Sequence, residues 1–243
     1  MDYPYDLGPY SRKVTTTSTD AQRWFDRGLN WCFGYHHEEA VACFEKALEA
    51  DPDCAMAHWG VAYAAGPNYN FPWELMDPAG KAAALASAYD ATRAALALTG
   101  GVTAPERALI EALPARYPQR DTIDDQRAWN DAYADAMRLA HQAHPSDLEV
   151  RHIFAEAILN RTPWQMWDPH TGEPTLGAGT LETREVLESA FRDLPEAMGH
   201  PGLLHLHVHL MEMSPHPEAA LVTGDRLREL TPDMGHLVHM PTH

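Results

Sequence analysis

The sequence has few cysteines and few basic residues. Its 243 residues include three cysteines, Cys32, Cys43 and Cys54, which are spaced eleven residues apart. An odd number without C-x-x-C spacing argues against a disulfide framework, a zinc knuckle or a redox motif, so we interpret them as buried structural thiols. Only 18 Lys and Arg residues face 35 Asp and Glu, giving a formal net charge of −17. This charge repels phosphate backbones and anionic lipid head groups, so we expect no nucleic-acid and no membrane partner.

Long apolar runs and a signal peptide are also missing from the sequence. No stretch approaches 18 consecutive apolar residues, and residues 1–6 have neither the basic nor the apolar part of a secretory signal. We therefore expect a cytoplasmic protein. Apolar residues make up 45% of the chain, which is enough for a core that folds without outside help.

Helical patterns fill most of the chain. Residues 1–19 are polar, contain two prolines and a threonine-rich run, and predict a flexible leader, with Asp20 as a candidate N-cap of the following helix. Further helices are predicted at 55–65, 79–98, 104–113, 122–143, 147–159, 180–192, 202–213 and 217–230, and another opens at 235. Stretches 66–73 and 160–180, rich in proline and aromatic residues, predict two ordered loop insertions. The sequence therefore predicts a single all-α domain over residues 20–243.

The stretch from Ala21 to Pro52 resembles one tetratricopeptide repeat, a 34-residue helix-turn-helix unit. The matching positions are Trp24, Gly28, Trp31, Ala40, Phe44, Ala47 and Pro52. Small Gly28 and Ala40 let two antiparallel helices approach closely, while Trp24, Trp31 and Phe44 fill the space between them. Because one such hairpin cannot bury its face alone, the resemblance implies a tetratricopeptide-like superhelix, an α-solenoid of antiparallel helical hairpins.

Histidines gather near the end of the sequence. Eight of the fifteen lie there: His200, His205, His207, His209, His216, His236, His239 and His243. Residues four apart share a helix face, so His205 pairs with His209 and His239 pairs with His243. The two pairs are separated by one repeat length, which places them at equivalent positions on adjacent parallel helices. We therefore expect four imidazoles to converge in the concave groove as a metal site.

Other side chains near these pairs have candidate roles. Glu212, three residues after His209, is a candidate catalytic base, a carboxylate ligand or a hydrogen-bond acceptor that fixes a histidine tautomer. His236, three residues before His239, is a further candidate ligand. His207 lies about 200° around the helix from its neighbours, so we expect it to be packed or on the surface. Trp164 and Trp167 fit equally well as a pocket wall or as a plug at the end of the stack.

Several phrases extend the family resemblance beyond one repeat. Residues 57–62, 66–70, 164–168, 200–205 and 235–243 resemble a family of bacterial and fungal tetratricopeptide-like proteins that carry an HPGLLH and a GHLVHMPTH phrase. The resemblance covers roughly residues 20–243. Members of that family look to continue past the Met-Pro-Thr-His phrase, which implies that this chain is truncated at its C-terminus. An uncapped last repeat would expose apolar surface and favour a homo-oligomer.

Two functions follow as hypotheses. The first is a metal-binding protein, with enzyme activity left open, that uses His205, His209, His239 and His243 as ligands. Copper, zinc and iron all accept imidazole, and nearby methionines slightly favour copper. The alternative is a scaffold whose concave groove binds a small molecule or a peptide without metal. The predicted groove helices carry histidine instead of lysine and arginine, which argues against a site that grips acidic peptide ends.

Overall fold

The computed structural model describes residues 3–243, and this part of the chain is all-helical. Its α-helices are α1 (Thr19–Phe33), α2 (His37–Ala50), α3 (Ala55–Ala65), α4 (Pro78–Ala97), α5 (Ala104–Arg116), α6 (Arg127–Ala143), α7 (Leu148–Leu159), α8 (Thr180–Asp193), α9 (Pro201–Met211), α10 (Leu221–Leu230) and α11 (Gly235–His239). Short 3-10 segments join several of them. Residues 3–243 form no strand and only two isolated β-bridges. The predicted all-α class is confirmed.

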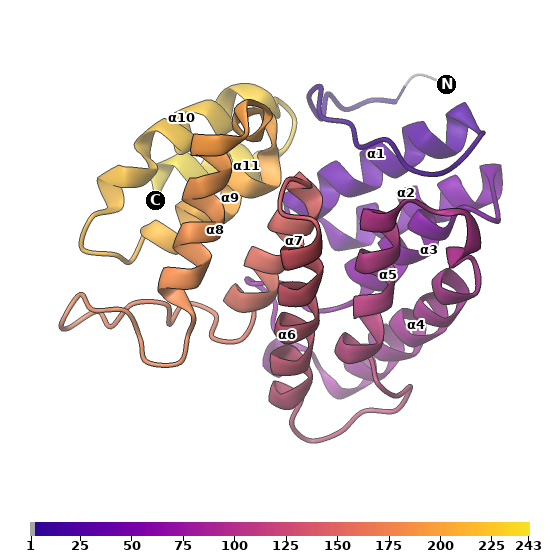
Figure 1. Ribbon diagram of the computed structural model, residues 1–243, viewed down its shortest axis with the longest axis horizontal. Helices are drawn as coiled ribbons and strands as arrows, with labels where there is room; N and C mark the ends of the chain where they lie inside the picture. Colours follow the sequence, from indigo (N-terminus) through magenta and orange to yellow (C-terminus); the bar gives the residue numbers. More distant parts are fainter. Residues whose placement is uncertain (1–2) are drawn as a thin grey trace.

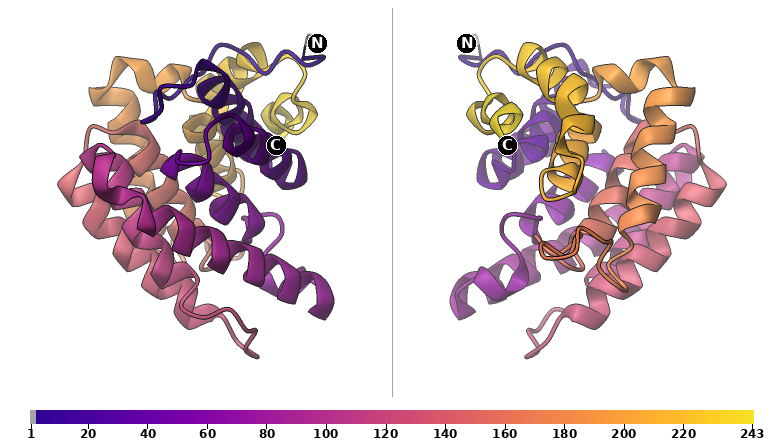
Figure 2. Two further views of the ribbon diagram at one scale, coloured as in Figure 1. Left: turned by 90° about the vertical axis from the view of Figure 1, so that its right-hand side faces the viewer. Right: turned by 90° about the vertical axis from the view of Figure 1, so that its left-hand side faces the viewer.

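Neighbouring helices pack side by side, and the two ends of the chain also meet. Helices α1 to α5 occupy one half of the molecule and α8 to α11 the other, with α6 and α7 between them (Figure 1). The side views show the N-terminal segment beside the last helices (Figure 2). In an open stack each repeat contacts only its neighbours, whereas here α1 also packs against α9. The first hairpin therefore lies next to the histidine-rich helix.

Three helices form the centre of the molecule. Every residue of α9 is buried, and so are all residues of α7 except Leu148 and most of α3. A helix that is buried on all sides normally has apolar residues on every face. Helices α7 and α9, however, also carry charged residues and histidines. Buried polar groups are costly unless they find partners. The buried polar side chains of α7 and α9 are therefore candidate functional residues.

The first hairpin is built around the ring of Phe44. This buried ring lies between Gly28 of α1 and Gly60 of α3, where an added Cβ would come within 2.7 Å and 2.5 Å of ring carbons. The close approach expected at Gly28 is confirmed. Trp24 differs from the expectation, because it is only partly buried and packs against the side chains of Arg27 and Lys46. Its amphipathic ring thus covers the outside of the hairpin.

The N-terminal segment differs from the predicted leader. Residues 3–18 contain no helix, but Leu7 and Val14 are only 6% and 4% exposed and belong to the core. The Tyr10 hydroxyl donates a hydrogen bond of 2.9 Å to buried Glu149 of α7. Arg12 forms a two-point ion pair with Asp147, at 2.8 and 3.1 Å. Residues 1–2 of the predicted leader lie outside the described residues.

Several helix boundaries also differ from the predicted ones. The N-cap of α1 is Ser18, whose side chain accepts a bond from Ala21, so the expectation for Asp20 was wrong. Helix α3 spans the predicted residues, whereas α6 begins at Arg127, five residues late. Helix α11 is short and passes into a 3-10 turn over Met240–Thr242. Among residues 3–243, no helix combines the length and apolar character that crossing a bilayer would take.

Candidate metal centre

Helix α9 holds the first imidazole pair. The helix begins at Pro201, and the side chain of His200 caps it by accepting a 3.1 Å hydrogen bond from the backbone N–H of Leu203. One turn apart, His205 and His209 are 1% and 3% exposed, and their ring centroids are 4.6 Å apart. The pairing predicted for these two residues is confirmed, and it lies in the interior of the protein.

Helix α11 supplies the third imidazole. The Nε2 atoms of His236 and His205 are 3.1 Å apart, and His236 is partly buried. One ligand atom from each of His205, His209 and His236 lies within 4.8 Å of the others. Three convergent imidazole nitrogens are the donor set of many zinc and copper sites. These three residues therefore form the candidate metal centre.

His239 and His243 lie outside this set of three. They form a separate pair, with Nε2 atoms 3.0 Å apart, and both are exposed. The structure thus does not place His239 opposite His205, while the His243 ring lies 6.1 Å from that of His209, and the four-histidine metal site stays a prediction. Both histidines of α11 lie within its single turn, yet His236 faces His205, whereas His239 pairs with His243.

Glu212 connects the two groups of histidines. Its Oε1 is 3.1 Å from Nδ1 of His209, and its other oxygen contacts Nδ1 of His243. A carboxylate acceptor holds the proton of His209 on Nδ1 and so leaves Nε2 as a free lone pair. That Nε2 atom is buried and has no hydrogen-bond partner in the described chain. Glu212 thus favours the tautomer of His209 whose Nε2 carries a lone pair.

Burial keeps the three imidazoles neutral. It lowers the pKa of His205 well below its usual range, and neighbouring His209 and His236 lower it further. The pKa of His236 falls to about 4 for the same reasons. Burial also lowers the pKa of His209, although the Glu212 carboxylate opposes this shift. Since a metal binds only the neutral ring, the centre is in its metal-binding form at neutral pH.

Two tyrosines enclose the centre. The Tyr35 ring lies 4.6 Å from His205 and is stacked on His209 at 5.9 Å, and the Tyr69 ring lies 4.7 Å from His209. Tyr35, at the turn between α1 and α2, has a φ of 58°, which is uncommon for a bulky residue. Such strain persists only where surrounding packing maintains it, and it gathers at functional sites. No sequence signal identified Tyr35, because its position depends on this unusual turn.

Both predicted ordered loops contact the centre or the helix that carries it. Trp164, the other non-glycine residue with a φ of 58°, donates a backbone bond of 3.0 Å to the Tyr69 hydroxyl. The Trp167 indole donates to the Leu210 carbonyl of α9 at 2.7 Å. Trp164 thus holds a wall of the centre through Tyr69, and Trp167 fixes α9 itself. Tyr69 lies in the first loop, which the sequence marked as ordered without singling out this residue.

The remaining buried histidines of α9 serve packing. The Nδ1 atom of His207 is 2.9 Å from the Thr223 hydroxyl on α10, and His207 is buried, so it takes the packed one of the two positions expected for it. Besides capping α9, His200 lies 3.3 Å from the carboxylate of Glu149. Burial would raise the pKa of Glu149, but His200, His152 and Arg12 together hold it well below its usual range. This second polar cluster ties the N-terminal segment to α7 and α9.

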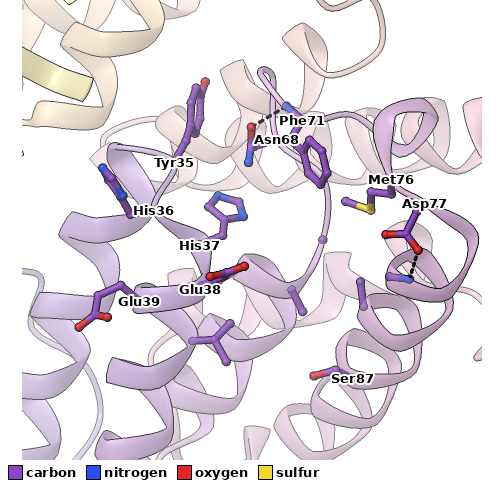
Figure 3. A pocket seen from close by; sticks show the side chains of 16 residues that line it. Tyr35, His36, His37, Glu38, Glu39, Asn68, Phe71, Met76, Asp77 and Ser87 are labelled. Carbon is purple, nitrogen blue, oxygen red and sulfur yellow. Dashed lines mark hydrogen bonds between the residues drawn. The ribbon is translucent and has the colours of Figure 1, made fainter. Parts of the chain in front are cut away.

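A cavity of about 810 Å³ opens on the other side of Tyr35. Its lining comes from the start of α2, the end of α3, the following loop and α4, and includes Tyr35, His37, Gly66 and Phe71. Figure 3 shows His37 directed toward the middle of these residues, with Tyr35 at the edge. Charged residues of the lining are acidic, namely Glu38, Glu39 and Asp77. Tyr35 therefore contacts both the candidate metal centre and a large cavity.

No protein-family model matches the chain, and no curated protein matches it either. The functional proposal for this protein therefore rests on the geometry of the candidate centre.

Proposed function

We propose that this protein binds one transition-metal ion through His205, His209 and His236. The observation that carries the proposal is the convergence of three neutral imidazoles, one of which has a buried, unpartnered Nε2 and a carboxylate on its Nδ1. The unpartnered Nε2 of His209 lies close to nitrogens of two other imidazoles, so its lone pair is available to a cation that all three rings can bind. Imidazole donors suit copper, zinc and iron.

Glu212 would hold a ligand in place in such a centre. Both of its oxygens accept bonds from imidazoles, so neither is free to take a proton from a substrate. We therefore assign it to fixing the His209 tautomer rather than to general-base catalysis. Three protein ligands leave a coordination position open on the metal, as in catalytic zinc sites, where the ion activates water or a substrate oxygen. A metalloenzyme is the functional class that this open position supports.

We further propose that the helices form a tetratricopeptide-type superhelix. Support comes from the first hairpin, where Phe44 packs between two glycines at the spacing of that repeat. Support also comes from the order of packing, in which α1 pairs with α2, α3 with α4 and α9 with α10. The contact of α1 with α9 would then be a closure of the superhelix around the histidine centre.

Elemental analysis tests the metal proposal. Protein produced without a polyhistidine tag is loaded with zinc or copper, passed through a desalting column, and compared with a His205→Ala/His209→Ala variant. We expect one ion per chain in the parent and none retained in the variant. A His216→Ala variant serves as a control, because His216 is exposed and interacts with Glu218 away from the centre. Equal metal content in the parent and the double variant would refute the proposal.

A scaffold function without metal is the second candidate. The observation that favours it is the 810 Å³ cavity beside Tyr35, which has the size of a small-molecule pocket and is lined by an exposed Phe71 and by carboxylates. Its charge would suit a small molecule or a peptide with a cationic group. Binding of an oligolysine peptide that persists in the His205→Ala/His209→Ala variant, and is lost on Glu38→Gln/Glu39→Gln substitution, would favour this function. No binding by the parent protein would count against it.

A further inference from the structure

A second imidazole pair lies at the surface, beside the three-histidine centre. His239 is the last residue of α11, and His243 follows the 3-10 turn Met240–Thr242. Their ring centroids are 4.9 Å apart, and their Nε2 atoms are 3.0 Å apart. Both side chains are exposed, and neither belongs to the converging ligands of that centre. The proposed function therefore leaves this pair unexplained.

Glu212 fixes the tautomer of His243. One of its carboxylate oxygens contacts Nδ1 of His243, while the other lies 3.1 Å from Nδ1 of His209. An ionised carboxylate only accepts hydrogen bonds, so Nδ1 of His243 carries the ring proton. In the neutral ring, Nε2 then has a lone pair and no hydrogen. The Nε2 atom that faces His239 is therefore an acceptor.

The tautomer of His239 follows from its contact with Thr242. The Thr242 hydroxyl donates its hydrogen to the His239 carbonyl at 2.8 Å, and its oxygen is 3.3 Å from Nδ1 of the His239 ring. A hydroxyl has a single hydrogen, so this oxygen accepts a bond from Nδ1–H. The Nε2 atom of the neutral His239 ring is thus an acceptor as well. Two ring nitrogens with lone pairs therefore face each other at 3.0 Å.

Two such nitrogens repel each other unless a positive charge lies between them. Two imidazoles bound to one metal ion have nitrogens about 2.9–3.4 Å apart, since each metal–nitrogen bond is about 2.0–2.1 Å long. Histidines that bind metals also donate their other N–H to an oxygen acceptor, often a carboxylate, and both of these rings do so. A proton shared by the rings gives a similar separation, and a metal titration distinguishes the two.

Electrostatics favours a cation at this position. The formal net charge of −17 raises the local concentration of cations around the protein. The Glu212 carboxylate contacts one ring of this pair and one ring of the three-histidine centre, and these two rings, His243 and His209, lie 6.1 Å apart. Its negative charge is therefore close to both metal positions and offsets part of the repulsion between two ions.

We propose that His239 and His243 form a second metal site, which binds a divalent transition-metal ion reversibly from solution. Two protein ligands leave the remaining coordination positions to water, so we expect the ion to exchange readily and to be lost on a desalting column. Among divalent ions copper binds imidazole most tightly, so Cu²⁺ is the probe for this site. The site requires no ion in the three-histidine centre, and it adds a second, weaker equivalent to the single ion held there.

Equilibrium dialysis against Cu²⁺ buffered with glycine counts ions of both kinds. With protein that carries no tag, we expect two ions per chain in the parent and one in His239→Ala, which keeps its ion after desalting. The His205→Ala/His209→Ala variant should also bind one ion, but should lose it on desalting. Adding His239→Ala to that variant should abolish binding. Since His239 is exposed, its substitution leaves the core intact.

His216→Ala is the matched control and should bind two ions. His216 is exposed and its Nδ1 lies 3.2 Å from Glu218, but no second imidazole lies against its ring within residues 3–243. A single ion in the parent that persists in His239→Ala would overturn the second site, and so would two ions in His239→Ala. An ion that the double variant binds, and loses when His239→Ala is added, supports the second site even if the three-histidine centre binds none. The two proposals can therefore fail independently.

Discussion

Replacing Gly60 with alanine should destabilise the protein, although alanine is the better helix former. The added Cβ would lie 2.5 Å from one carbon of the Phe44 ring and 2.6 Å from the next, both closer than real contacts allow. The ring cannot move away, because Gly28 bounds its other side with a corresponding approach of 2.7 Å. The substitution therefore forces a shift of α3 against α2.

The magnitude follows from two opposing effects. Overpacking a filled core costs about 1–3 kcal/mol. Replacing a helical glycine with alanine stabilises by about 1 kcal/mol. We therefore expect Gly60→Ala to lower the free energy of unfolding by up to about 2 kcal/mol, measured by urea denaturation with an unchanged m-value.

Gly224 of α10 provides the matched control. A Cβ there would meet Pro241 at 3.5 Å, an ordinary contact, so Gly224→Ala should raise the free energy of unfolding by about 0.5–1 kcal/mol. Combining Gly60→Ala with Phe44→Leu should cost less than the sum of the two single substitutions, because a smaller side chain relieves the clash. If Gly60→Ala stabilised the protein as Gly224→Ala does, the packing argument for this hairpin would be refuted.

Three further predictions concern buried polar groups. Tyr10→Phe removes a donor from buried Glu149 and should cost about 1–3 kcal/mol in urea denaturation; a change near zero would mean that this hydrogen bond does not stabilise the fold. Burial lowers the pKa of His37 to about 4 in the folded protein. As the pH falls below about 6.5, His37 therefore binds a proton in the unfolded chain before it does so in the folded protein. Stability should therefore be lost through this interval, by on the order of 2 kcal/mol at pH 5, and His37→Leu should show a smaller loss than the parent. If the stability of His37→Leu depended on pH as that of the parent does, the loss of stability could not be assigned to His37. Glu212→Gln should weaken metal binding about 10–100-fold in a competition titration with a chelator, and unchanged affinity would remove Glu212 from the account.

Local patterns predicted the helices and the first pair of ligands. The residues of α3 and the contact of Gly28 with Phe44 follow from helical periodicity and repeat spacing, and so does the pairing of His205 with His209. These features depend on residues close in sequence. Their geometry is fixed by the helix itself.

Other features depend on contacts that a sequence pattern does not contain. Leu7 and Val14 are too widely spaced to show a period, so their burial was missed. His236, and not His239, lies opposite His205, which depends on how the short helix α11 is placed against α9. Tyr35 reaches the centre through a turn of positive φ. Tertiary packing determines all of these positions.

The most direct test of the metal centre compares two single variants. His236→Ala and His239→Ala are titrated with zinc and with copper beside the parent, by calorimetry on protein without a tag. The three-histidine centre predicts that His236→Ala loses stoichiometric high-affinity binding, whereas His239→Ala keeps one site with nearly the parent's affinity. Loss of the site in His239→Ala with retention in His236→Ala would contradict the centre and would favour the arrangement that repeat spacing predicts.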